Sequence, residues 1–177
     1  MLAVRDAFRA ILKQQSKLLR GISDDVYTFR CPVLEGTTGG HIRHSLDHLR
    51  RSLACPDEDT SKPHEPLIRY DIRARNTAVE LDRHAAMDEM DYILSLAAHV
   101  DHDYLRQPVR AAFMLTAEGK ETEIHSTIER EMAFAVHHGI HHNAMIKTIL
   151  KANFPSIALP DTFGVAPSTL NFRAKEG

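Results

Sequence analysis

A chain of 177 residues, 43% hydrophobic and 26% charged, has the length and composition of one globular domain. Its formal net charge of −2 gives no reason to expect nucleic acid or an anionic membrane as a partner. No apolar run reaches the roughly 18 residues of a membrane span, and Arg5, Asp6 and Arg9 interrupt the start where a signal peptide is apolar. We therefore expect a cytoplasmic protein with a single domain over residues 1–177.

The first three predicted elements are amphipathic helices. Residues 2–22 repeat apolar side chains at helical spacing. A second helix is predicted from Thr37 or Thr38, either of which can serve as its N-cap, to about residue 53. After a polar loop, Asp82 is the predicted N-cap of a third helix, which runs to about residue 100.

The hydrophobic period changes after the third helix. Residues 109–116 and 122–125 flank a turn sequence and predict a β-hairpin. Ser126 and Glu129 form a capping-box pair that opens a fourth helix, predicted to end near Ala152. Residues 153–177 are expected to form an irregular C-terminal tail. The predicted fold class is all-α, a four-helix bundle with a small β-hairpin inserted before the last helix.

Histidine is the unusual residue of this chain, with 12 copies against no tryptophan. Seven of them fall in two short windows, one in the second predicted helix and one in the fourth. The windows are His41, His44 and His48, and His137, His138, His141 and His142.

On the fourth helix, a rotation of about 100° per residue places His138 and His142 on the same face as its apolar side chains. His137 and His141 fall toward the flank, whereas Glu131 lies about 20° from His142 on the inner face. Imidazoles at positions i and i+4 can both bind one metal ion at about 2.0–2.1 Å. The alternative is a pair of core histidines that hydrogen-bond to carbonyls or to Glu131.

The second helix offers a third ligand. His41, His44 and His48 share one helical face, opposite the apolar side chains of that helix. This face is either solvated or directed into a polar cleft between helices, where bundle proteins place metal sites. The spacing alone does not choose among the three histidines.

Two segments, "TTGGHIRHSLDHL" and "EREMAFAVHHGIHHNAMI", resemble the DinB/YfiT-like family, and "YDIRARNTAVELD" and "FGVAPSTL" are similar to segments of an uncharacterised subgroup. The resemblance covers about residues 37–170. It implies an up-down-down-up four-helix bundle, a homodimer, and a divalent-metal site formed by His44, His138 and His142. It also implies a low-molecular-weight thiol as a possible second cofactor.

An ion such as Zn²⁺ or Ni²⁺ at three histidines would support a thiol-dependent transferase or a hydrolase. Glu131 or His141 is the candidate base for hydrolysis, and orienting a ligand histidine is the alternative role of Glu131.

Tyr70, Arg73 and Arg75 are candidate contacts to a substrate or thiol cofactor, because guanidinium groups pair well with carboxylates. The alternative for the arginines is a solvated charged stretch. The expected function is thus a metal-dependent enzyme acting on a small molecule, with a non-catalytic dimeric module of the same fold, for metal or ligand binding or a stress response, as the alternative.

Overall fold

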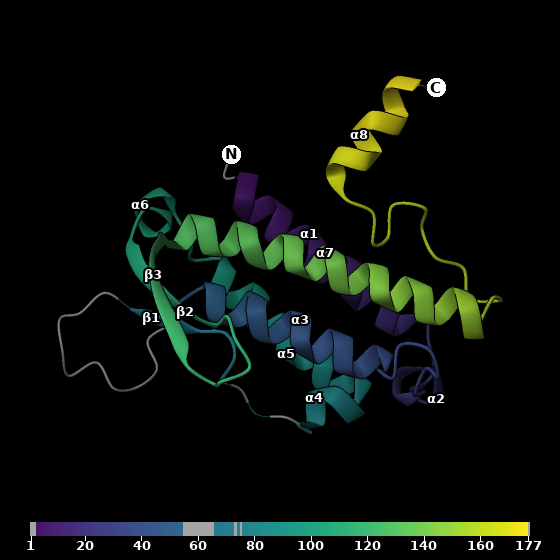
Figure 1. Cartoon of the computed structure of the whole chain (residues 1–177). Helices are drawn as coiled ribbons and strands as arrows, with labels where there is room; N and C mark the ends of the chain where they lie inside the picture. Colours follow the sequence, from purple (N-terminus) through teal and green to yellow (C-terminus); the bar gives the residue numbers. More distant parts are fainter. Residues whose placement is uncertain (1–2, 55–65, 73, 75, 177) are drawn as a thin grey trace.

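The computed structural model describes residues 3–54, 66–72, 74 and 76–176, and its four long helices lie side by side (Figure 1). They are α1 (Ala3–Arg20), α3 (Thr38–Ser52), α5 (Arg83–Ala97) and α7 (Ile128–Asn153). Helix α7 packs against α1 and α3, and both of these also contact α5. All four predicted helices are therefore confirmed.

Side-chain caps fix where these helices begin. Thr37 Oγ1 accepts a hydrogen bond from the Gly40 amide at 2.8 Å at the start of α3. Asp82 Oδ1 accepts from the His84 amide at 2.7 Å at the start of α5. The capping-box interpretation of α7 is wrong, because its N-cap is Thr127. The Ser126 hydroxyl instead donates to Glu131, so the helix begins two residues after Ser126.

The core lies between the long helices and is built from their apolar stripes. Burying these side chains is the main source of stability for helices of this length. Fully buried members include Phe8, Leu12, Leu19, Ile42, Leu46, Leu49, Met90, Ile93, Ile128 and Met132. Three short helices that the sequence did not predict lie between the long ones in chain order: α2 (Asp24–Thr28), α4 (Ala78–Leu81) and α6 (His102–Leu105).

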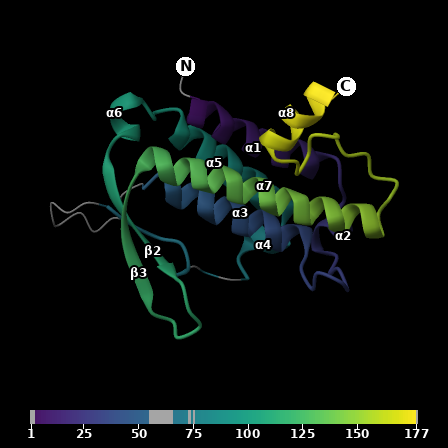
Figure 2. The same cartoon turned by 45° about the horizontal axis from the view of Figure 1, so that its top comes forward.

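A three-stranded sheet lies at one end of the long helices (Figure 2). Strands β2 (Pro108–Met114) and β3 (Glu121–Thr127) form the predicted hairpin, with Val109 opposite Ser126. Strand β1 (Leu67–Arg69) pairs parallel to β2, with Leu67 opposite Arg110. Strand β1 was not predicted from the sequence, because three residues are too few to show a strand period.

The predicted fold class is therefore wrong. The described residues form eight helices and a mixed sheet, in the order β1-β2-β3, rather than a four-helix bundle with a hairpin. The prediction of an irregular tail is also wrong for its last part, because Pro167–Glu176 forms helix α8. This helix projects from the helical body (Figure 1). None of the described residues of α8 is buried, so this helix has no buried apolar face whose spacing could have predicted it from the sequence. Among the described residues, no helix combines the length and apolar character that a membrane span requires.

Candidate metal centre

Three histidines from two adjacent helices converge on one point. His44 belongs to α3, and His138 and His142 lie one turn apart on α7. Each offers one ring nitrogen, and the three atoms all lie within 4.8 Å of one another. Nε2 of His142 is 3.1 Å from Nε2 of His138.

The His138–His142 distance suits a tetrahedral ion. Two nitrogens that each lie about 2.0–2.1 Å from one ion in that geometry are about 3.4 Å apart, close to the His138–His142 separation. The ligand form of histidine is the neutral ring. Burial, with a smaller contribution from His138 and His41, lowers the pKa of His142 to about 2, so its ring is neutral near pH 7. The donor set therefore fits a divalent transition-metal ion.

A close approach of three helices holds the histidines in place. A Cβ atom built on Gly139, between the two α7 histidines, would lie 3.1 Å from Ile11 Cγ1 and 3.2 Å from Ser45 Oγ. The Gln15 amide donates to Ser45 Oγ at 2.8 Å and to Asn143 Oδ1 at 3.0 Å. This buried polar cluster joins α1, α3 and α7 directly beside the candidate ligands.

His41 contacts the centre through His142. Its Nδ1 lies 3.0 Å from Nδ1 of His142, so the two nitrogens of the His142 ring face His41 and His138. Burial lowers the pKa of His41, and the neighbouring His141 lowers it further. A metal-bound histidine usually donates its second ring N–H to a neighbour, and His41 occupies that position.

An aromatic stack contacts the centre through His138. The His48 ring stacks on His138 with a centroid distance of 4.0 Å and on Tyr70 with one of 4.8 Å. Nδ1 of His48 also lies 3.1 Å from the backbone oxygen of His44, one turn earlier in α3. His48 is thus tied to two of the three candidate ligands.

Tyr70 connects this stack to a buried carboxylate. Its hydroxyl donates to Glu131 Oε2 at 2.8 Å, while Ser126 and Arg130 donate to Glu131 Oε1 at 2.5 Å and 2.8 Å. Glu131 is fully buried, so these three bonds compensate a charge that would otherwise be costly. Burial and the Glu131 charge raise the pKa of Tyr70, which stays a neutral donor.

The other predicted site residues differ in exposure and in their distance from the three ligands. His137 and His141 are exposed, as the face geometry predicted, with the His141 ring 5.4 Å from that of His142. Tyr70 is 1% exposed and committed to Glu131, so it faces the interior rather than a ligand at the surface. Arg73 and Arg75 lie outside the described residues.

The sequence left open whether His41 and His48 face solvent or a neighbouring helix, and their contacts with His142 and His138 decide for the helix. The spacing of the three histidines did show that His41 and His48 share a helical face with His44. What the spacing could not show is that this face meets α7 rather than solvent.

No family model and no solved structure matches the chain. The chain is similar to FK506-binding protein 5 of Rhizopus delemar, with 32% identity over 170 residues that cover 92% of this chain. The same residues cover 43% of that protein, so the chain spans less than half the length of the curated relative. The assignment to the DinB/YfiT-like family is therefore wrong, and the bundle topology and dimer that it implied lose their basis.

Proposed function

We propose that this chain is a metal-dependent hydrolase of a small molecule, with a divalent transition-metal ion held by His44, His138 and His142. The convergence of their ring nitrogens within 4.8 Å carries the proposal. Three protein ligands are the usual number in catalytic zinc sites, because they leave one position open to water or substrate. An ion bound in this way acts as a Lewis acid and can lower the pKa of water to about 7.

The surrounding residues have separate roles in this proposal. His41 orients the His142 ring through the contact between their Nδ1 atoms. The exposed His141 is placed to exchange protons with solvent beside the centre. Glu131 is a positioning residue, because its carboxylate holds Tyr70, whose ring supports His48 and thereby His138.

Two other ligands do not enter the proposal. A thiol cofactor was implied mainly by the family resemblance, and it stays a prediction. The relative's name records binding of FK506, but the chain covers 43% of that protein, and the proposal rests on the histidines instead. A zinc or nickel ion and a cytoplasmic location stay predictions.

Cobalt(II) titration tests both the ligands and the open position. We expect one equivalent to give the visible absorption of a four-coordinate ion, and azide to change that spectrum by entering the open position. The His138→Ala variant should lose the spectrum, whereas His137→Ala, at an exposed position on the same helix, should keep it. A spectrum that azide leaves unchanged would contradict a catalytic centre and indicate a closed structural site.

A further inference from the structure

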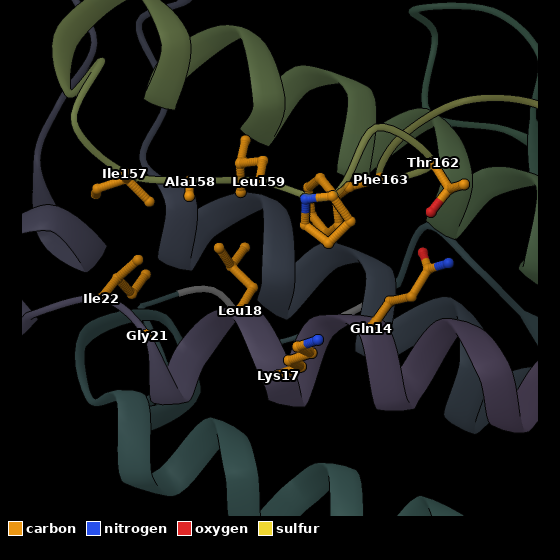
Figure 3. A pocket seen from close by; sticks show the side chains of 11 residues that line it. Gln14, Lys17, Leu18, Gly21, Ile22, Ile157, Ala158, Leu159, Thr162 and Phe163 are labelled. Atoms are coloured by element: carbon orange, nitrogen blue, oxygen red, sulfur yellow. The ribbon is translucent and has the colours of Figure 1, made fainter.

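A cavity lies away from the three candidate ligands, between α1 and the segment 157–163 that follows α7 (Figure 3). Its volume is about 230 Å³, and it shares no described lining residue with the metal centre. An apolar cavity of roughly 150 Å³ is large enough to hold benzene. By proportion, this cavity accommodates about nine carbon-sized atoms.

The outer wall of the cavity is fixed rather than loose. Lys147 Nζ on α7 donates to the backbone oxygens of Asp161 and Phe163 at 3.2 Å and 2.9 Å. Phe163 is 2% exposed and belongs to the core. Gly164 has a φ of +64°, and a Cβ there would lie 2.6 Å from the Ala144 amide nitrogen, so the backbone rests directly on α7. The cavity is therefore preformed, as ligand sites usually are.

The lining separates into an apolar part and a polar end. Leu18 and Ile22 on α1 and Phe163 on the facing segment are buried apolar lining residues. At one end, the side chains of Gln14 and Thr162 point toward each other (Figure 3). Lys17 lies on α1 between Gln14 and Leu18 and, within the described part of the chain, forms no ion pair.

We propose that this cavity binds a carboxylic acid with an aliphatic chain of about eight carbons. The chain would lie along α1 over Leu18 and Ile22, where it is removed from water. The carboxylate would accept hydrogen bonds at the polar end from Lys17, Gln14 and Thr162, whose donors complement its charge. This ligand site is independent of the metal centre.

Calorimetric titration with octanoate, in buffer containing EDTA, tests the site. We expect saturable binding of one octanoate per chain and weaker binding of octanol, which has the same chain without the charge. Lys17→Met should weaken octanoate about threefold, a modest effect because this ammonium group is exposed. The matched Lys13→Met change, one turn earlier on α1 and outside the lining, should leave the affinity unchanged.

A blocking variant tests the apolar part. Ala158 is an exposed lining residue, so Ala158→Trp should fill the cavity, abolish octanoate binding and preserve the circular dichroism spectrum. Absence of saturable binding to the unaltered protein, or full binding to folded Ala158→Trp, would overturn the proposal. Octanol binding as tight as that of octanoate would overturn the carboxylate assignment.

Discussion

The His142 ring determines the hydrogen positions around the centre. If Nε2, which faces His138, binds an ion, the ring hydrogen lies on Nδ1 and is donated to Nδ1 of His41. The His41 hydrogen is then on Nε2, which is buried and has no hydrogen-bond partner among the described residues. His41 is therefore tied to the binding-competent tautomer of His142.

Replacing His41 by phenylalanine keeps an aromatic ring but removes the acceptor. We expect His41→Phe to weaken zinc binding at least about tenfold, the usual size of an effect on a group that orients a ligand. Competition with a chromophoric chelator measures the affinity. His137→Phe, at an exposed position of α7, is the control. An affinity equal to that of the unaltered protein would show that His41 does not orient His142.

The Tyr70 hydroxyl donates a hydrogen bond to the fully buried Glu131 carboxylate, and removing that bond should lower the free energy of unfolding. Tyr70→Phe leaves Glu131 with one donor fewer, and we expect a decrease of about 1–3 kcal/mol in the free energy of unfolding. Urea denaturation measures the change. Tyr92→Phe is the matched control, because that ring is 47% exposed and should change stability by less than about 0.5 kcal/mol. Equal effects of the two substitutions would contradict the role given to the Tyr70–Glu131 bond.

At the scale of elements, the caps and long apolar stripes made the four long helices predictable. Thr37 and Asp82 predict the starts of α3 and α5 from local sequence. A cap residue hydrogen-bonds to an amide in the first turn of its own helix, so the signal lies within a few neighbouring residues. Strand β1 and helix α8 had no such signal. The three residues of β1 are ordered by pairing with β2, more than 40 positions later, which no local pattern encodes.

The start of α3 is packed against α4 without space for a side chain. A Cβ on Gly39 would lie 2.1 Å from the Glu80 backbone oxygen and 2.8 Å from Tyr27 Cε1. We therefore expect Gly39→Ala to lower the free energy of unfolding by about 1–3 kcal/mol, since backbone must move to relieve the contact. Thermal unfolding checks this against Gly21→Ala, whose Cβ would meet nothing closer than 3.5 Å. A melting temperature unchanged in Gly39→Ala would refute the close contact of α3 with α4.

At the scale of the whole molecule, the candidate site was only partly predictable. Periodicity placed His138 and His142 inward, because both belong to one helix. His44 could be chosen over His41 and His48 only from the packing of α3 on α7. The family resemblance that suggested His44 is wrong. The Gln15–Ser45–Asn143 cluster, which joins three helices beside the site, depends on contacts across up to 128 positions of sequence and left no local pattern.

The metal-free protein should lose stability in acid. Burial lowers the pKa of His142 to about 2 in the folded state, whereas an unfolded histidine has a pKa of about 6.5. Between these values the unfolded chain binds more protons, so stability is greatest above pH 6.5 and falls below it by up to about 1.4 kcal/mol per pH unit. Urea denaturation in EDTA at several pH values measures this slope. We expect a smaller slope in His142→Ala and no change in His137→Ala, while identical slopes in all three proteins would contradict a buried neutral His142.

The central claim is that His44, His138 and His142 bind one ion, and elemental analysis of untagged protein tests it most directly. A histidine tag would add ligands of its own and obscure the count. We predict about one zinc or nickel ion per chain in the unaltered protein and in His137→Ala, and none in His44→Ala or His138→Ala. No retained ion after loading with zinc or nickel and removal of the excess, or equal metal content in all four proteins, would contradict the metal centre.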